Sequence, residues 1–451
     1  MFSNHNKILA DTVKRLLRRN ANGHLLKIVN KTHAADLSHI LRELSINQQK
    51  NIFNKIERLE TQGTLLSELD NDILLNITKD IPDDLFINIL EKMPNDDVAD
   101  LLGKLPQERA DVLLEKMKKE DSEELEGLLK YDDKTAGGII VPDFIALKED
   151  VTAKEAIDSL QKEYVSVEMP FYLYVVDEYG RLVGVCSLRQ LVVVSPDTPL
   201  KDFMSVDVFS VQTDVDQEEV AKLVAQYDIL AVPVLDESHK LVGIVTVDDI
   251  IDIIREEATE DILKMAGAGE EFVETKSVMR STRIRLPWLF ASCIGGILAF
   301  LIIGQFETAL QKWTFLAAFI PVIMGMGGNV GTQSSTIVVR GLATGRITIR
   351  DIGGVVGKEV SIGLILGIFY GILVGIVALA TYNMWALGVV VGVALLSSML
   401  VAAIVGSFVP MLFARMNIDP AVATGPFVTT SIDIISVFAY FKIAMTLLNL
   451  K

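Results

Sequence analysis

The chain has 451 residues, of which 50% are hydrophobic, and its 42 Lys and Arg against 59 Asp and Glu give a formal net charge of −17 at pH 7. So acidic a chain lacks the basic surface that nucleic-acid binding requires, and we expect no nucleic-acid partner. The only two cysteines, Cys186 and Cys293, exclude a disulfide framework and a thiolate metal cluster.

The acidity belongs entirely to the front of the chain. Residues 286–451 hold eight Lys or Arg and five Asp or Glu, so the negative balance comes from the first 285 residues. An acidic surface of this kind either attracts divalent cations or is simply solvated, and charge alone favours neither. The first 20 residues lack a continuous apolar core, so they do not resemble a signal peptide.

A short helical unit repeats early in the chain. Pro82, Pro94 and Pro106 follow one another at intervals of twelve residues. Acidic or amide residues come directly after each proline, and an apolar helical pattern follows them. Proline in a first helical turn is a helix-start signal. We therefore predict an all-α helical-repeat domain over residues 35–134, preceded by an N-terminal segment at 1–34. The repeat alone indicates a packing scaffold.

A second repeat has an offset of 59 residues. Residues 177–185 read Asp-Glu-Tyr-Gly-Arg-Leu-Val-Gly-Val, and residues 236–244 read Asp-Glu-Ser-His-Lys-Leu-Val-Gly-Ile. Each copy predicts a strand, a turn and a strand that lead into a helix. The two copies resemble a tandem pair of α/β cystathionine-β-synthase-type (CBS) domains, at 135–199 and 200–262. Such modules commonly sense adenosine nucleotides.

In CBS modules a Ser or Thr followed three residues later by Asp can hold a ribose. The second copy has Thr246 and Asp249 at this spacing, whereas the first has Ser187 and Gln190. One of the two candidate nucleotide sites therefore lacks its acid.

Asp249 has a competing role. With Asp252, Glu256 and Glu260 it follows a three- and four-residue spacing, which places four carboxylates on one face of a helix. Like charges at that spacing repel one another unless a cation neutralises them. The pattern fits a solvated face or a divalent-cation surface equally well.

Five apolar stretches follow residue 285, at 286–303, 315–339, 360–381, 387–413 and 421–448. Each reaches or approaches the ~20 residues that a transmembrane helix needs. We predict an α-helical transmembrane domain with five spans over 285–451, joined to the CBS pair by a connecting helix at 263–284. Basic residues gather on alternate connectors, so the positive-inside rule places the N-terminus in the cytoplasm and the C-terminus outside.

Asp433 is the only acidic residue in the last apolar stretch. A carboxylate at membrane depth is costly and is usually functional. It follows Gly-Pro-Phe-Val-Thr-Thr-Ser-Ile at 425–432, a helix breaker and hydroxyls that suit a hydrated cavity. In the second stretch Asn329, Thr332 and Gln333 offer further oxygens, either for helix packing or for a pore lining. No Walker motif or nucleophile arrangement is present, so we expect no enzymatic activity.

These motifs together resemble one family. Gly-Gly-Asn-x-Gly-x-Gln-Ser at 327–334, Asp419-Pro420, the 425–430 segment with Asp433, and a helical repeat plus CBS pair ahead of five spans are similar to the MgtE family of magnesium transporters. The resemblance implies a homodimeric, ion-gated channel that passes Mg²⁺ into the cytosol across the plasma or inner membrane. It also implies that Asp433, Asn329, Thr429 and Thr430 line the pore.

The family likeness further implies a gate. Cytoplasmic acids would bind Mg²⁺ as the regulatory ion, with ATP as a candidate regulatory ligand, and a helix at about 270–283 would transmit closure to the pore. By position the sensing acids are Asp96, Asp97, Asp100, Asp214, Asp216, Asp228, Asp249, Asp252, Glu257, Glu260, Asp261 and Asp419.

Two alternatives stay open on the sequence alone. One is a membrane-anchored CBS nucleotide sensor that transports nothing. The other is a transporter of a different divalent cation, Co²⁺, Ni²⁺ or Ca²⁺, because the sequence does not fix the ion.

Overall fold

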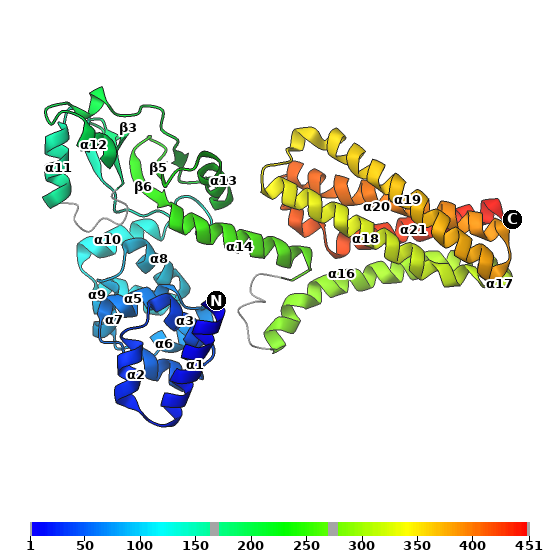
Figure 1. Ribbon diagram of the computed structural model, residues 1–451, viewed down its shortest axis with the longest axis horizontal. Coiled ribbons are helices and arrows are strands. Elements are labelled where there is room, and N and C mark those ends of the chain that lie inside the picture. The colour runs from blue at the N-terminus through cyan, green and yellow to red at the C-terminus, as the bar shows by residue number, and fades with distance from the viewer. Residues whose placement is uncertain (1, 163–170, 269–277, 449–451) are drawn as a thin grey trace. The chain divides into compact units, whose positions relative to one another are not determined.

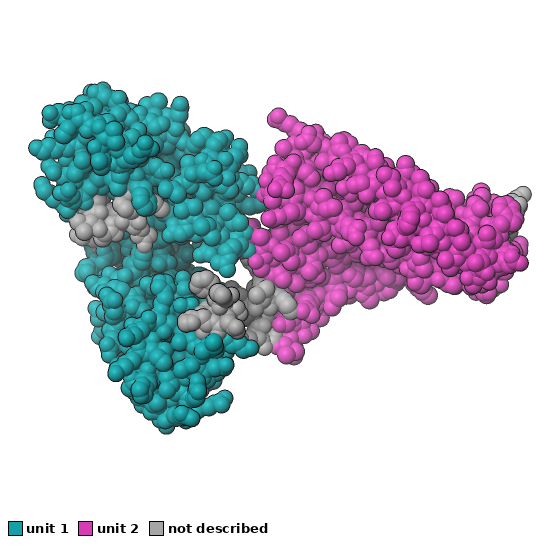
Figure 2. Space-filling view, in the orientation of Figure 1, with its two compact units in different colours: residues 1–255 teal, residues 256–451 magenta. Residues whose placement is uncertain are grey.

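The computed structural model describes residues 2–162, 171–268 and 278–448, and Figure 1 traces the chain. These residues divide into two units, 1–255 and 256–451, which Figure 2 colours separately. The predicted fold class is confirmed: a helical N-terminal part and a CBS-like α/β pair come first, and a helical C-terminal part follows. The exact domain limits predicted from the sequence stay predictions.

Short helices form the first part of unit 1. They are α1 (Phe2–Arg18), α2 (Asn22–Val29), α3 (Ala34–Arg42), α4 (Ile46–Phe53), α5 (Leu59–Ser67), α6 (Asn71–Thr78), α7 (Asp83–Leu90), α8 (Asn95–Lys104), α9 (Gln107–Lys116) and α10 (Lys119–Leu128). Helices α7, α8 and α9 each begin one residue after a proline of the repeat. Proline is therefore the N-cap residue and does not lie inside the first turn. Its extended backbone at the N-cap sets the direction in which the helix starts.

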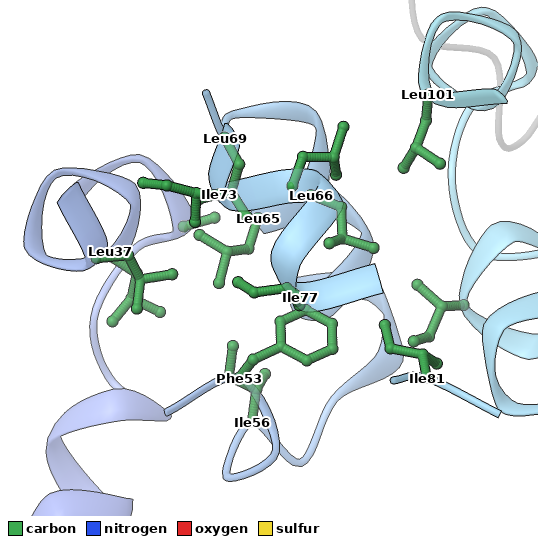
Figure 3. Packing of buried hydrophobic residues seen from close by; sticks show 14 of the residues in the cluster. Leu37, Phe53, Ile56, Leu65, Leu66, Leu69, Ile73, Ile77, Ile81 and Leu101 are labelled. Carbon is green, nitrogen blue, oxygen red and sulfur yellow. The ribbon is translucent and has the colours of Figure 1, made fainter. Parts of the chain in front are cut away.

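A leucine- and isoleucine-rich core holds these helices together. Leu37, Phe53, Leu65, Leu66 and Ile77 are all at most 2% exposed. They come from α3, α4, α5 and α6, and Figure 3 shows several of them meeting in the centre of this core. Because the helices that supply this core, α3 to α6, are only two to three turns long, their stability comes from this packing and not from helix propensity. The repeat is therefore a folded scaffold that can present α8 at a fixed place.

Two three-stranded sheets follow, one in each CBS copy. The first contains β1 (Ala146–Lys148), β2 (Tyr172–Val176) and β3 (Leu182–Ser187), with α11 (Ala153–Lys162) and α12 (Leu188–Val193). The second contains β4 (Val211–Gln212), β5 (Ala231–Leu235) and β6 (Leu241–Thr246), with α13 (Gln217–Tyr227) and α14 (Val247–Met265). In both sheets the first strand is parallel and the third antiparallel to the middle one. A 3-10 turn, η1 (Leu200–Asp202), joins the copies.

The hairpin turns explain the 59-residue repeat. Asp177 Oδ1 accepts hydrogen bonds from the backbone N–H of Tyr179 and Arg181, and Asp236 Oδ1 accepts the same pair of bonds in the second copy. Gly180 and His239, at equivalent positions, have φ of 79° and 61°. An aspartate that bonds its own turn and a residue in the left-handed region are what this turn needs. The two turns also meet, through a bond from Leu241 N to Gly180 O.

Long helices make up unit 2. They are α16 (Val278–Gln305), α18 (Leu316–Ala343), α19 (Ile352–Tyr382), α20 (Trp385–Arg415) and α21 (Pro426–Leu447), with the short α17 (Glu307–Lys312), η2 (Ile349–Asp351) and η3 (Pro420–Ala423) between them. Among the described residues, four helices are long and apolar enough to cross a membrane, namely all but α18. Helix α18 has 28 residues, but its Asn329, Thr332 and Gln333 make it less apolar. It packs against α20 and α21.

The predicted connecting helix at 263–284 falls partly on residues 269–277, which lie outside the described residues. On their C-terminal side, Val278 onward belongs to α16, so the basic segment with Arg280, Arg283 and Arg285 continues directly into the first spanning helix.

Glycine lets the long helices approach at backbone distance. A Cβ on Gly406 of α20 would lie 2.5 Å from the carbonyl oxygen of Gly331 in α18. In α19 a Cβ on Gly371 would lie 2.7 Å from Gly392 O of α20, and one on Gly375 would lie 2.8 Å from Gly388 O. Small residues at such crossings are the usual means by which membrane helices pack, because no hydrophobic effect drives them together within lipid.

Gly406→Ala should destabilise the membrane unit by about 1–3 kcal/mol, because the added methyl group meets a backbone atom that cannot rotate away. The matched control is Gly328→Ala on α18, where nothing lies within 4 Å of the added Cβ. That control should be neutral or slightly stabilising, since alanine favours helix over glycine. Denaturation of the purified protein in detergent measures both, and equal stability of the two variants would contradict the close approach.

Candidate cation sites

Asp433 lies on α21, which starts at Pro426 directly after Gly425. Its side chain is half-buried. It makes no hydrogen bond or ion pair with any residue that the structure describes, although the neighbouring Ile432 is fully buried against α18. A carboxylate in a spanning helix needs a counter-charge or water. Asp433 thus has no counter-charge among the described residues.

The two predicted threonines of α21 face different surroundings. Thr429 is one turn before Asp433 and so shares its helix face, and its Oγ1 lies 3.3 Å from the carbonyl oxygens of both Gly425 and Pro426. Thr430 packs against α16, where a Cβ on Gly295 would lie 1.9 Å from Thr430 Cγ2. Thr429 thus lies beside Asp433, whereas Thr430 packs where α21 crosses α16.

Asn329 is exposed on α18 in the single chain, as are Thr332 and Gln333. The opposite face of α18 is buried, since Gly327 and Gly331 lie against Ile432 of α21. This packing turns the amide- and hydroxyl-bearing face of α18 away from the chain's own core. The face is thus available to water, to an ion or to another chain.

Buried hydroxyls fix the helices that carry these groups. Ser398 Oγ on α20 lies 3.1 Å from Ile323 O of α18 and 2.8 Å from Ser436 Oγ of α21. At the other end, the Tyr440 hydroxyl donates to Leu316 O at 2.9 Å. Helices α18, α20 and α21 are therefore tied together by polar bonds in an apolar surrounding, where such bonds have few competitors.

Glu359 is a buried acid that the sequence analysis missed. It is 5% exposed on α19 and accepts a 2.7 Å hydrogen bond from Ser334 Oγ of α18. The sequence predicts an apolar stretch that begins at residue 360, but the helix begins at Ile352. Extending the predicted span by one residue would have included Glu359, and the helix itself begins two turns earlier than the prediction. It joins α18 to α19, so it is a candidate positioning residue for the α18 face.

In unit 1 the structure brings Asp97 and Asp100 of α8 close to Asp249 of α14. Burial, together with the negative charges of Asp100 and Asp249, raises the pKa of Asp97 to about 6. Burial also raises the pKa of Asp249, against a 2.6 Å hydrogen bond from Thr246 Oγ1 that favours its charged form. Burial raises the pKa of Asp100 as well, although part of that side chain stays exposed. In all three groups burial is the largest cause, because it disfavours the charged form of a carboxylate.

A divalent cation would suit this group chemically. No set of three or more His, Cys, Asp or Glu side chains among the described residues is arranged to hold a metal by itself. Mg²⁺, however, keeps several of its waters and commonly takes only one or two carboxylates. Asp97, Asp100 and Asp249 fit binding through such waters. Asp96, on the same first turn of α8, is half-buried.

Other predicted sensing acids have local roles in the single chain. Asp216 caps α13 by accepting from Glu218 N at 2.8 Å, Asp228 ends that helix with φ 52°, and Asp252 pairs with Arg255 at 3.1 Å. Asp214 is exposed. The helix expected for Asp249, Asp252, Glu256 and Glu260 exists as α14, but Asp249 and Glu260 are at least partly buried, so the four do not form one solvated face.

In unit 2 the predicted acids lie near the membrane end of α14. Glu257 and Asp261 are half-buried there. Glu260 and Asp419 share the ammonium of Lys264, which lies 2.7 Å from Asp419 Oδ2 and also pairs with Glu260. Burial alone would lower the pKa of Lys264, but the bonds with Asp419 and Glu260 outweigh it and raise that pKa. The structure therefore joins two of the acids predicted to sense Mg²⁺, Glu260 and Asp419, through a lysine that the sequence did not single out.

A domain of short helices and a CBS pair, followed by a bundle of long apolar helices, define a multi-pass membrane protein with a large part outside the membrane. Family models match the MgtE divalent cation transporter domain at residues 320–443, the MgtE intracellular N domain at 32–134 and CBS domains at 136–197 and 200–256. The chain belongs to the MgtE family, as the sequence resemblance predicted.

Among curated relatives, the magnesium transporter MgtE of Thermus thermophilus is 40% identical over 329 residues, 72% of this chain and 73% of that protein. The magnesium transporter MgtE of Enterococcus faecalis is 40% identical over 321 residues, 71% of each chain. A solved structure of the cytosolic domain of the Mg²⁺ channel MgtE in complex with ATP has 34% identity and a TM-score of 0.51. It covers 54% of this chain and 99% of that one.

Asp97→Asn should remove part of the pH dependence of stability. In the folded protein Asp97 has a pKa of about 6 against an ordinary value of 3.8, so the folded state holds the extra proton between these values. The stabilisation that the protonated Asp97 gives to the folded state is therefore lost as the pH rises through its folded-state pKa of about 6. We expect Asp97→Asn to stabilise the metal-free protein at pH 7 by about 1–2 kcal/mol after allowance for solvent screening, and to have little effect at pH 4.

Thermal unfolding of the full chain in a chelator at the two pH values measures this difference. Asp207→Asn, at an exposed position of a connecting loop, is the matched control and should leave the profile of the parent unchanged. If Asp97→Asn destabilised the protein at pH 7, the carboxylate would be a stabilising group and the assignment would be wrong.

Proposed function

We propose that this protein is a homodimeric Mg²⁺ channel that carries Mg²⁺ into the cytosol and closes when cytosolic Mg²⁺ binds its acidic domains. The single observation that carries the proposal is Asp433, a half-buried carboxylate in a spanning helix without a partner among the described residues. Membership of the family and the names of the relatives support Mg²⁺ as the transported ion.

The pore chemistry follows from the ion. Mg²⁺ sheds its waters reluctantly, so a site of few carboxylates, hydroxyls and carbonyls can bind it through those waters. Two chains related by a twofold axis would present two copies of Asp433 and Thr429, with Asn329 on the neighbouring α18 face. The paired carboxylates would repel one another without a cation, which favours a divalent occupant.

A second chain also accounts for exposed surface in the single chain. Helix α16 buries only Gly295 and Ala299 among its described residues. The polar face of α18 is likewise uncovered, although it belongs to a helix packed among spans. A partner subunit that covers these faces would give Asn329 and Asp433 a shared, water-filled interior instead of lipid.

We propose that the N-terminal unit lies in the cytosol and the C-terminus outside. Arg340, Arg346, Arg350 and Lys358 flank the connector between α18 and α19, and Arg280 to Arg285 precede the hydrophobic part of α16. The connectors at the other ends carry only Lys312. This asymmetry is the one that sets membrane orientation.

The gate rests on the acids of unit 1. Without Mg²⁺, Asp97 and Asp100 of α8 repel Asp249 of α14. With Mg²⁺ their charge is neutralised, so the domains hold together in the closed state. The remaining predicted sensing acids would act in the same sense wherever a partner chain or water completes their sites.

ATP is proposed as a regulatory ligand of the second CBS copy. The related cytosolic domain was solved in complex with ATP. Here Thr246 and Asp249 are bonded to each other at the start of α14, while in the first copy Ser187 and Gln190 form the capping box of α12. Because Asp249 also faces the acids of α8, nucleotide and Mg²⁺ would act on one residue.

Asp433→Ala should abolish Mg²⁺ uptake, a loss of at least about a hundredfold, because the pore would lose the carboxylate that is proposed to bind the ion. Purified protein in liposomes with an internal Mg²⁺ indicator measures the flux. Glu307→Ala, which removes an acid from the short α17, is the control and should transport normally.

Normal Mg²⁺ flux in Asp433→Ala would reject the pore assignment. No flux in the parent protein, with nucleotide binding intact, would instead favour a membrane-anchored nucleotide sensor. Competition by Co²⁺, Ni²⁺ or Ca²⁺ in the same assay identifies the preferred ion.

Combining Asp97→Asn with Asp249→Asn should leave the channel conducting at Mg²⁺ concentrations that close the parent, because the contact loses two of the carboxylates that Mg²⁺ bridges. We expect the inhibitory midpoint to rise by roughly tenfold or more. Single-channel recording across a range of cytosolic Mg²⁺ tests it, with Asp207→Asn as control. Unchanged inhibition would show that closure depends on other acids.

A further inference from the structure

A lysine stands between two of the acids proposed to sense Mg²⁺. Lys264 Nζ lies 2.7 Å from Asp419 Oδ2 and also pairs with Glu260 one turn before it on α14. Glu260 is only 8% exposed, and the side chain of Lys264 is 28% exposed. Asp419 is 155 residues away in the sequence, so only the fold brings the three together. The ammonium thus occupies the place between two carboxylates where a bridging cation would bind.

This triad lies where α14 meets the start of the pore helix. The other oxygen of Asp419 accepts a 2.8 Å bond from Ala421 N and so caps η3, which runs into α21. At Gly425, the residue before α21, an added Cβ would lie 3.2 Å from Met265 O and 3.7 Å from Gly267 N. Gly267 has φ of 70°, which lets the chain turn away after α14. The last turn of α14 therefore rests on the first turn of α21.

An ammonium and a divalent cation compete for such a place. Both need the same carboxylate oxygens, and the Lys ammonium is a compact, strongly hydrated charge, as is Mg²⁺. One cation must leave before the other can bridge the acids. The ammonium is tethered to the helix that carries Glu260, so its local concentration is high and independent of ionic conditions.

We propose that Lys264 is a built-in competitor of Mg²⁺ at Glu260 and Asp419, which sets the cytosolic Mg²⁺ concentration at which the channel closes. The inference rests on the proposed function, because it takes these two acids to be sensing ligands. When Mg²⁺ is scarce, Lys264 bridges the two acids and keeps α14 on α21 without repulsion. When Mg²⁺ is plentiful, it displaces the ammonium and couples the same two helices through a divalent ion.

Lys264→Gln tests the proposal, because it removes the charge and keeps a side chain of similar length. The Mg²⁺ concentration that half-inhibits flux should fall, by about tenfold, since a competing charge-assisted contact is gone. Lys264→Arg keeps the charge and should stay close to the parent. The control is Lys222→Gln, which breaks the exposed 2.9 Å pair with Glu218 on α13 and should not shift the midpoint.

A midpoint that rises in Lys264→Gln would overturn the proposal, because Lys264 would then assist closure as a structural pin. An unchanged midpoint would overturn it too, since the triad would have no part in sensing. Lys264→Met serves as a second uncharged variant if Lys264→Gln folds poorly, and it should show the same fall.

Direct binding separates this inference from the proposed function. Titration of MgCl₂ into the full-length protein in detergent, followed by calorimetry and by the rise in unfolding temperature, should give tighter binding in Lys264→Gln than in the parent. If the parent conducts no Mg²⁺ but the variant still binds it more tightly, the channel proposal fails while the competition stands. If the parent conducts and closes with Mg²⁺ but binding in the variant is not tighter, only the competition fails.

Discussion

Negative charge that the described chain does not neutralise governs this structure at two places along its length. On α8 and α14, burial raises the pKa of Asp97, Asp100 and Asp249, and the charge of Asp249 adds to the rise at Asp97. On α21, Asp433 has no counter-charge among the described residues. Buried or membrane-embedded carboxylates are costly without a cation, so each place holds free energy that a divalent ion can release. Between them, at the end of α14, the chain supplies a cation of its own.

This arrangement links stability to ion concentration. If every acidic residue had an internal ion pair, the protein would be stable but Mg²⁺ would not change its conformation. If no acidic residue had one, repulsion between the carboxylates would prevent the proposed closed state. Here the helical repeat and the CBS cores provide the rigid, apolar support, with Phe53 and Tyr174 among their largest buried side chains. The acids at their contact can then change protonation or bind ions without disturbing those cores, because the two functions use different residues.

Periodic and local features of the sequence were sufficient for much of this description. The 12- and 59-residue repeats predicted the short helices and the twin sheets, since each repeat contains its own start signal, Pro94 or Asp177 for example. Asp433 was recognisable as one charge in an apolar run. Features that depend on distant contacts were not predictable: Lys264 meets Asp419 across 155 residues, and Glu359 gains its meaning from Ser334 on another helix. Thr430 likewise turned out to face Gly295, which no spacing rule reveals.

The crossing of α19 and α20 has a mechanical consequence. Gly371 meets Gly392 and Gly375 meets Gly388 backbone to backbone, so no side chain lies between the two helices at this level to change rotamer and absorb a shift. Packed elements without such adjustable filling move together or not at all. We therefore expect α19 and α20 to move as one rigid unit. Helix α18 meets α20 in the same way at Gly331 and Gly406, so a relative movement of the spanning helices is easiest for α16, which buries only Gly295 and Ala299 among its described residues.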